Sequence, residues 1–303
     1  EYVYDLEMQD DTEHTFFAND ILVHNSCYFC IEPIFNVLNI NLQKDGIITE
    51  EAREVIKEID VYLNEQIKIW AKKELKAIDP RFVFKQETVC DVALFDAKKR
   101  YILHIIDKEG KAPKKPFKYV GVEIARSTIS KEVKELIKSV IEFAMLAQDK
   151  KKADIIFKKA HEDFCNMPVE DISIRTKISD YEKYEAKIDQ NGQVGKGTTL
   201  QARSAIHFNK LLKHFNLDHI YESIGSAMKL KYFYSSKNPF NYKSMAFMEK
   251  YPKELYEHVK PDYQVMFDKI VAPPLERFYD CIGWRLPQTG REVQTDLFDL
   301  FGI

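Results

Sequence analysis

The stretch His14-Thr-Phe-Phe-Ala-Asn-Asp-Ile-Leu-Val-His-Asn-Ser26 ends in three side chains whose combined chemistry can cut a peptide bond. The side-chain nitrogen of Asn25 can attack its own carbonyl carbon, which closes a succinimide ring and releases the chain that follows. The Ser26 hydroxyl can first accept an acyl group from upstream, as in ordinary nucleophilic catalysis. His24 can protonate the scissile carbonyl, and His14 is a second candidate for proton transfer near neutral pH. The stretch therefore predicts catalytic roles for His14, His24, Asn25 and Ser26 in breaking the bond before Ser26.

The residues around this stretch have the pattern of short β-strands. Residues 2–8 alternate large apolar residues with other residues, as a half-buried strand does. Residues 9–12 are typical of a turn, and Asn19-Asp20 predicts another between two short apolar runs. In order and spacing, residues 3–26 resemble the C-terminal end of an intein, although Thr15 stands where that family more often has Asn. The resemblance implies a Hint-type segment, residues 1–25, that undergoes protein splicing; an incidental surface hairpin is the alternative.

The composition is that of a globular protein with a large core. The chain has 303 residues, of which 45% are hydrophobic and 31% charged. No apolar run approaches the length of a membrane span, so we expect no membrane partner. Because the sequence starts without an initiator Met, we expect it to belong to a longer precursor.

Five cysteines without paired spacing predict reduced thiols in a cytoplasm. Cys27 and Cys30 form a CxxC pattern, but no second Cys or His pair accompanies it. Since both lie in an apolar run, buried structural thiols are expected there rather than a metal site.

The net charge of −3 argues against a general nucleic-acid binder. The positive charges are nevertheless clustered, at residues 98–100, 111–118 and 150–152 and at Lys229 and Lys231. A charge cluster is usually a solvated surface, so these clusters predict DNA binding only in combination with a sharper motif.

Downstream of Ser26 the pattern predicts an α+β fold. Residues 27–38 are apolar and predict a strand, and Thr49 is a candidate N-cap for a long helix that ends at Asp79-Pro80. Four strands of a β-meander are expected next, at 81–85, 88–95, 99–106 and 117–124. A long helix beside antiparallel strands forms an α+β layer.

Past Arg126 the periodicity is mostly helical. Ser130 can cap a helix with an apolar stripe at Val133, Leu136, Ile137, Val140 and Ala144. Further helices are expected at 152–164, 200–215 and 261–279, the last interrupted by Pro273-Pro274, and a strand at 228–234. Residues 189–199 are polar and rich in Gly and predict a loop.

Four motifs from Ser26 onward resemble motifs of family B DNA polymerases. Ser26-Cys-Tyr-Phe29 is similar to the end of the YGDTDS motif, and Lys98-Lys99-Arg100-Tyr101 matches the KKRY motif. Gly121-Val-Glu-Ile-Ala-Arg126 is similar to the G-x-E-x-x-R segment that joins palm and thumb. The terminal Leu297-Phe-Asp-Leu-Phe301 is similar to the clamp-binding tail of tailed-phage replicative polymerases. The resemblance implies four domains: an intein segment (1–25), the C-terminal part of the palm (26–125), a thumb (126–289) and a clamp-binding tail (290–303).

The resemblance implies that Lys98, Lys99, Arg100 and Tyr101 grip the primer strand, because cations bind phosphate without reading sequence. An exposed basic strand edge that discourages aggregation is the alternative. Arg126 and the helix after it would face duplex phosphates. In the tail, a hydrophobic pocket on a sliding clamp would accept Gln294, Leu297, Leu300 and Phe301; packing of the tail on its own thumb is the alternative.

The implied cofactor is Mg²⁺, held by Asp residues outside this chain, with no metal ligand within it. Glu87 is a possible outer-shell carboxylate, and a solvated charge at a strand end is the other interpretation. The implied partners are primer–template DNA, deoxynucleoside triphosphates, a sliding clamp and the N-terminal half of the polymerase and intein. The expected location is the cytoplasm of a virus-infected bacterial cell.

The resulting hypothesis is a C-terminal part of a DNA-directed DNA polymerase joined to an intein end. It would be active as a nucleotidyltransferase once joined to its N-terminal half, by splicing in cis or, if the gene is split, in trans. Two alternatives stay open. One is a non-catalytic module that binds DNA and recruits a clamp, and the other is an autoprocessing domain on an unrelated host.

Overall fold

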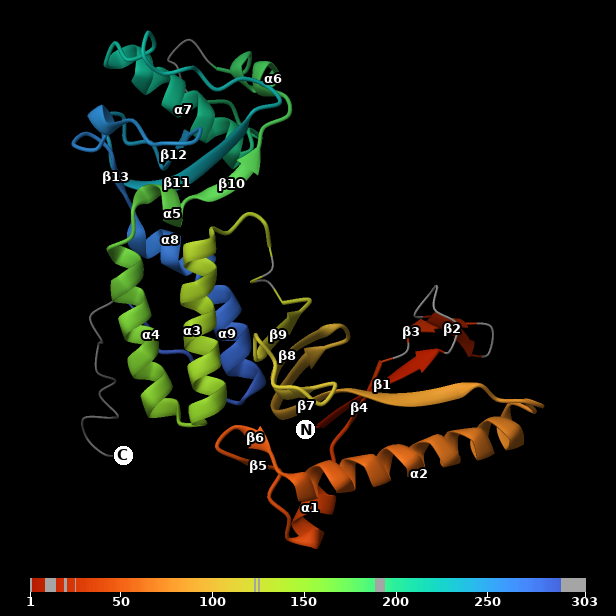
Figure 1. Ribbon diagram of the computed structural model, residues 1–303. Coiled ribbons are helices and arrows are strands. Elements are labelled where there is room, and N and C mark those ends of the chain that lie inside the picture. Colours follow the sequence, from red (N-terminus) through yellow and green to blue (C-terminus); the bar gives the residue numbers. More distant parts are fainter. Residues whose placement is uncertain are drawn as a thin grey trace, which may run out of the picture. The chain divides into compact units, whose positions relative to one another are not determined.

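The computed structural model describes residues 2–8, 15–18, 21–24, 26–122, 124, 126–188 and 194–289. For Phe82, Phe84 and the described residues up to 28, it describes the backbone but not the side chains. Contacts divide the chain into two compact units, Glu1–Val122 and Glu123–Ile303. Both units combine helices with antiparallel sheets (Figure 1). The fold is therefore α+β, as the sequence predicts. None of the described helices is long and apolar enough to cross a membrane.

The first unit is built on a five-stranded antiparallel sheet. Its strand order is β4 (Ser26–Phe29), β1 (Tyr2–Met8), β7 (Phe82–Ala97), β8 (Arg100–Lys108) and β9 (Phe117–Val120). Asp5 of β1 lies opposite Ser26 on one side and Lys85 on the other. β1 pairs with residues 82–88 of β7, whereas β8 pairs with residues 88–97 on the opposite edge. A separate hairpin of β2 (Thr15–Ala18) and β3 (Ile21–His24) joins Thr15 to His24.

Two predicted strands prove to be one. The strands expected at 81–85 and 88–95 form the continuous β7, because Gln86 and Glu87 between them are not turn residues. The strand expected at 117–124 ends at Val120, since Gly121 takes a φ of +65° that a regular strand does not allow.

The strand predicted at 27–38 is wrong beyond its first residues. β4 ends at Phe29, and helix α1 spans Glu32–Leu38. Pro33 stands in the first helical turn, where its fixed φ favours a helix, and Glu32 complements the positive end of the helix. A continuous apolar run does not distinguish a buried strand from a helix by its period.

Helix α2 (Glu50–Glu74) lies along β7 (Figure 1). The predicted cap is confirmed, since the Thr49 hydroxyl accepts a hydrogen bond from the Ala52 amide at 3.2 Å. The helix ends at Glu74, before the predicted end at Asp79-Pro80, and Lys76 has a left-handed φ of 56°. Ala52 and Ile56 are buried in a core shared with Val89 of β7 and Ile106 of β8. A small hairpin, β5 (Gln43–Lys44) and β6 (Ile47–Ile48), precedes the helix.

The helical part of the second unit packs around aromatic side chains. It consists of α3 (Lys131–Ala147), α4 (Lys150–Cys165), α8 (Tyr263–Ile270) and α9 (Ala272–Cys281). Phe157, Phe164, Phe267 and Tyr279 are buried at its centre. The Ser130 hydroxyl caps α3 by accepting from the Val133 amide at 3.2 Å, and all five residues of the predicted stripe are buried. Both predictions for this helix are confirmed.

The rest of the second unit is a small sheet with α7 (Leu200–His214) against β12 (Ser244–Phe247). Its other strands are β10 (Ile174–Lys177), β11 (Lys229–Lys237) and β13 (Lys260–Pro261). The sequence predicts only the β11 strand, because the other three are too short for an alternating pattern. The shortest helices are α5 (Val169–Ile172), α6 (Tyr181–Glu185) and the 3₁₀ turn Lys253–Leu255.

Candidate nucleic-acid interface

The two-residue turn between β7 and β8 carries a compact group of exposed basic side chains. Ala97 pairs with Arg100, so Lys98 and Lys99 form the turn, and Lys99 has a left-handed φ of 62°. Two-residue turns with positive φ match the twist of an antiparallel pair. Lys98, Lys99 and Arg100 are all exposed. The predicted motif therefore presents three cations at the tip of one hairpin.

Gly121 packs directly against this turn. A Cβ atom placed on Gly121 would lie 2.0 Å from the Lys99 carbonyl oxygen, which is far inside van der Waals contact. Only glycine fits this position, both for its positive φ and for the close approach of the two backbones. Two motifs that are separate in the sequence, Lys98–Tyr101 and the one that begins at Gly121, are thus in contact.

Tyr101 anchors the hairpin from its partly buried position. Its ring centroid lies 5.9 Å from that of Phe95 across the strand pair, and its backbone pairs with Val120 of β9. Arg100 Nη1 lies 3.9 Å from Asp96 Oδ2, a surface pair that contributes little to stability. The cations at the tip are therefore next to a contact between two aromatic rings, Phe95 and Tyr101.

The carboxylates of the sheet already have protein partners. Asp91 contacts His104 Nδ1 through Oδ1 and accepts from Gln43 Nε2 at 2.9 Å through Oδ2. Asp107 is only 1% exposed and contacts Arg53 Nη1 at 3.0 Å. Among the residues that the structure describes, no three His, Cys, Asp or Glu side chains could hold a metal ion.

Glu87 lies two strands away from Ser26. Asp5 is opposite both Ser26 and Lys85, and Glu87 follows Lys85 by two positions on β7. The Glu87 Oε1 atom is 3.8 Å from Lys118 Nζ. Lys98 stands at the far end of β7, on the order of 40 Å from Lys85 along the strand at roughly 3.3 Å per residue. The structure brings Glu87, but not the Lys98–Tyr101 turn, near the strand that begins at Ser26.

Two of the four predicted splicing residues fall outside the described part of the chain. His14 and Asn25 lie outside it, while the backbones of His24 and Ser26 end β3 and begin β4. The predicted clamp-binding residues, Gln294, Leu297, Leu300 and Phe301, also lie outside it. The roles assigned to these residues stay predictions.

Arg126 belongs to the second unit, where it is exposed and its carbonyl accepts from the Ile129 amide at 3.4 Å. The helix after it, α3, carries Lys131 and Lys134 near its start, whereas Lys138 pairs with Glu135 at 2.9 Å. Lys131 is exposed and Lys134 is partly buried.

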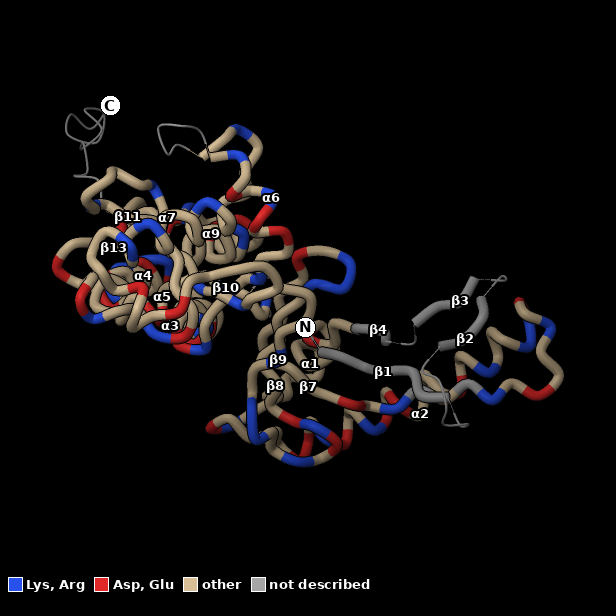
Figure 2. Tube along the Cα trace, turned by 90° about the horizontal axis from the view of Figure 1, so that it is seen from above, with Lys and Arg blue, Asp and Glu red and all other residues tan. Residues whose placement is uncertain are grey.

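A second basic cluster lies on the strand pair β10–β11. The sequence analysis identified Lys229 and Lys231 of β11 but not Arg175 and Lys177 of β10. Arg175 lies opposite Lys231, and Lys177 lies opposite Lys229. Like charges directly opposite each other destabilise a strand pair. Lys231 Nζ donates to the Glu170 carbonyl at 3.1 Å, and Asp171, whose pKa is raised by burial and by Glu132, interacts with Lys231 and Arg175. Figure 2 shows that both signs of charge are interspersed along the trace of each unit.

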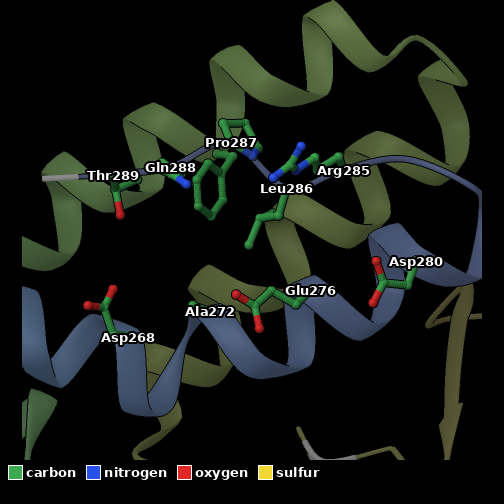
Figure 3. A pocket seen from close by; sticks show the side chains of 10 residues that line it. Asp268, Ala272, Glu276, Asp280, Arg285, Leu286, Pro287, Gln288 and Thr289 are labelled. Atoms are coloured by element: carbon green, nitrogen blue, oxygen red, sulfur yellow. The ribbon is translucent and has the colours of Figure 1, made fainter. Parts of the chain in front are cut away.

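A pocket of about 410 Å³ in the second unit is acidic (Figure 3). Asp268, Glu276 and Asp280 line it from α8 and α9, and Arg285 lines it from the segment that follows α9. Three carboxylates against one guanidinium repel phosphate. This pocket therefore lacks the positive charge that favours phosphate binding.

Buried titratable groups elsewhere are structural. Burial lowers the pKa of His207 to about 4, and its Nδ1 lies 2.9 Å from the Ser244 carbonyl oxygen. Burial raises the pKa of the Cys90 thiol to about 12. With pKa values shifted in these directions, the uncharged forms of both groups are favoured near neutral pH. Cys30, in contrast, is exposed, so the expectation of a buried thiol there is wrong because the chain leaves its strand at Phe29.

Comparison with known proteins relates part of the chain to DNA polymerases. No family model matches it. It is 30% identical over 188 residues to a DNA polymerase of Thermococcus aggregans, a match that covers 61% of this chain and 9% of that protein. A DNA polymerase of Thermococcus litoralis is 28% identical over 188 residues, with the same coverage of both chains. The chain thus spans less than a tenth of the length of these curated relatives, and it contains a segment related to DNA polymerases.

Proposed function

We propose that residues 26–125 are the C-terminal part of a polymerase palm and residues 126–289 a thumb, from a family B DNA polymerase of tailed-phage type. The contact between Gly121 and the Lys98–Lys99 turn carries the proposal. It joins two motifs that each resemble the same family. The similarity to DNA polymerases from two organisms supports it independently.

In this proposal the hairpin tip holds the primer strand. Lys98, Lys99 and Arg100 are exposed cations on a fixed turn, suited to phosphate oxygens and indifferent to base sequence. Tyr101 positions the turn through its contact with Phe95. Such binding meets the need of an enzyme that must copy any template.

On the second unit, Arg126 and the cations of α3 and of the β10–β11 pair would contact duplex phosphates. The opposed pairs Arg175–Lys231 and Lys177–Lys229 support this role, since a bound polyanion relieves the repulsion between them. The acidic neighbours Glu170 and Asp171 make this contact weaker than that of the hairpin tip.

Mg²⁺ would supply the charge that nucleotidyl transfer requires. Its ligands are proposed to lie in the N-terminal half, since the described residues offer no set of three. Glu87 remains a proposed outer-shell carboxylate, near the strand that begins at Ser26. Deoxynucleoside triphosphates would bind where the two halves meet.

Residues 1–25 are proposed to be an intein end that leaves the chain. Asn25 would cyclise and break its bond to Ser26, with His14 and His24 transferring protons and Ser26 receiving the acyl group. The register of β2 and β3 supports the proposal, because Thr15, which follows His14, pairs with His24. Residues 290–303 are proposed to bind a sliding clamp through Gln294, Leu297, Leu300 and Phe301.

The experiment for DNA binding compares two double variants of equal charge. Lys98→Ala/Lys99→Ala removes two cations of the tip, and Lys57→Ala/Lys68→Ala removes two exposed cations of α2. Fluorescence anisotropy on primer–template DNA, over a range of salt concentrations, measures affinity and its salt dependence.

We expect the tip variant to bind about 10-fold more weakly and to lower the salt slope by roughly one per lysine. The α2 variant should change neither quantity beyond about 2-fold. Equal losses in both variants would show that the tip binds DNA only through general charge. Adding the N-terminal half, Mg²⁺ and nucleotides then tests synthesis, and DNA binding without restored synthesis would favour a non-catalytic module.

A further inference from the structure

An apolar groove runs between helices α1 and α2 of the first unit. Its volume is about 520 Å³. Ile34 and Leu38 line it from α1, while Val55, Ile59 and Tyr62 line it from α2. Phe29 and Cys30 close the end nearest to β4. Leu38 is 50% exposed and Tyr62 is 60% exposed, so large apolar side chains face solvent along its length.

The apolar arc of α2 is wider than its packing on the sheet requires. Ala52, Ile56 and Ala71 are buried and form the face turned to the core. Val55, Ile59 and Tyr62 follow one another at four and three positions, which sets a second stripe beside the first. Val55 and Ile59 are partly buried against the core, whereas Tyr62 is 60% exposed. The solvent-facing edge of this second stripe therefore lines the groove, and a second partner would account for it.

One rim of the groove is acidic. Glu51, Glu54, Glu58 and Glu65 are exposed on α2, at spacings that place them on the side of the Tyr62 stripe away from the sheet. Glu58 itself lines the groove, and it is the one charged residue among the described residues of the lining. The complementary partner is therefore an apolar segment with Lys or Arg along one border.

We propose that this groove docks an apolar, basic-bordered segment of the N-terminal half of the polymerase. The inference rests on the proposed function, in which splicing joins that half to Ser26. Phe29, which lines the groove, is only three residues beyond Ser26, so the chain that splicing joins to Ser26 would enter the fold next to the groove. The matched 188 residues cover 9% of each polymerase relative.

Cys30 provides a built-in reporter of occupancy. It is exposed and lines the groove, whereas Cys281 is exposed in the second unit and is not among the lining residues. The full 303-residue chain is alkylated with iodoacetamide alone and after mixing with the purified N-terminal half. Tandem mass spectrometry separates labelling of Cys30 from that of Cys27 and Cys281.

We expect the N-terminal half to slow alkylation of Cys30 by about 10-fold or more and to leave the rate at Cys281 within about 2-fold. Equal rates at Cys30 with and without the N-terminal half overturn the proposal. Protection of Cys30 that grows with the concentration of the chain alone assigns the groove to a second copy of this chain and also overturns it.

Two single variants of α2 make the test specific to the groove. Tyr62→Glu places a charge in the groove, and Val61→Glu places the same charge one position away, at a side chain that is 61% exposed. Both sites are exposed, so both variants should keep the helical circular dichroism of the parent chain. We expect Tyr62→Glu to require about 10-fold more N-terminal half for half-maximal protection of Cys30, and Val61→Glu to require less than 2-fold more.

Primer extension in the same mixtures separates this inference from the proposed function. Restored synthesis with an unprotected Cys30 overturns the groove and leaves the polymerase intact. A protected Cys30 without synthesis supports the groove and contradicts the catalytic part of the proposed function. Absence of both complex and synthesis overturns both.

Discussion

Strand β7 pairs with β1 on one edge and with β8 on the other, and these two strands differ in their contacts with the rest of the first unit. β1 pairs with its residues 82–88, and β8 pairs with its residues 88–97 on the opposite edge. β8 begins directly after the basic turn, which contacts Gly121. Near its other end it carries Asp107, whose Oδ1 atom lies 3.0 Å from Arg53 Nη1 of α2. β1 belongs to the segment that is proposed to leave. One sheet thus combines a strand that contacts the rest of the unit with a strand that is proposed to be removed by splicing, and the backbone register alone does not distinguish them.

The largest loss of stability is expected on breaking the Arg53–Asp107 ion pair, which links α2 to β8. Asp107 is buried, and its Oδ2 atom accepts from the Gly110 amide at 2.9 Å and from Gln86 Nε2 at 3.2 Å. Arg53→Ala therefore removes the cation that contacts Oδ1 of a buried carboxylate. We expect a loss of roughly 3 kcal/mol in the free energy of unfolding, measured by urea denaturation. Arg81→Ala, which removes an exposed pair with Asp79, should cost less than about 0.5 kcal/mol. Equal losses in the two variants would mean that β8 is no more firmly fixed than the surface.

Deleting residues 1–25 tests the β1 side of the comparison. The amides of residues 83–88 that pair with β1 should then exchange with solvent on the order of 100-fold faster, because their partner strand is gone. The amides of residues 92–95, which face β8, should keep their protection. Hydrogen exchange read by mass spectrometry resolves the two halves of β7. Unchanged protection at 83–88 would show that β1 contributes nothing to the sheet.

A smaller effect is expected where β8 meets Gly121. Gly121→Ala forces the Lys99 carbonyl to move, whereas Gly46→Ala has the same left-handed strain with open space around the new Cβ. Both variants should lose about 1 kcal/mol from the backbone conformation, and Gly121→Ala should lose roughly 1–2 kcal/mol more. Only Gly121→Ala should also weaken binding to primer–template DNA. If the two alanine variants bind DNA equally well, the turn does not depend on Gly121.

Local chemistry allowed much of this fold to be predicted from the sequence. Thr49 and Ser130 cap their helices because an N-cap needs only a side-chain oxygen and an amide three residues ahead. The stripe of α3 followed from its period. The tip cations Lys98, Lys99 and Arg100 were predicted as a motif and are exposed on one turn.

The features that were not predicted depend on contacts between residues distant in the sequence, or on elements too short to show a periodic pattern. Helix α1 was predicted as a strand because an apolar run has no readable period. β10 has four residues, so the opposition of Arg175 to Lys231 could not be foreseen. The burial of Asp107 depends on Arg53, which lies 54 residues earlier. The contact of Gly121 with Lys99 requires the folded β7–β8–β9 meander.

The most direct test of the account is the mass of the mature polypeptide. The complete gene is expressed with Asn25 intact and as Asn25→Ala, and the products are digested and sequenced by mass spectrometry. The account predicts, for the intact gene, a peptide that joins upstream polymerase sequence directly to Ser26, and no such peptide for Asn25→Ala. An active polymerase that still carries residues 1–25 would contradict it.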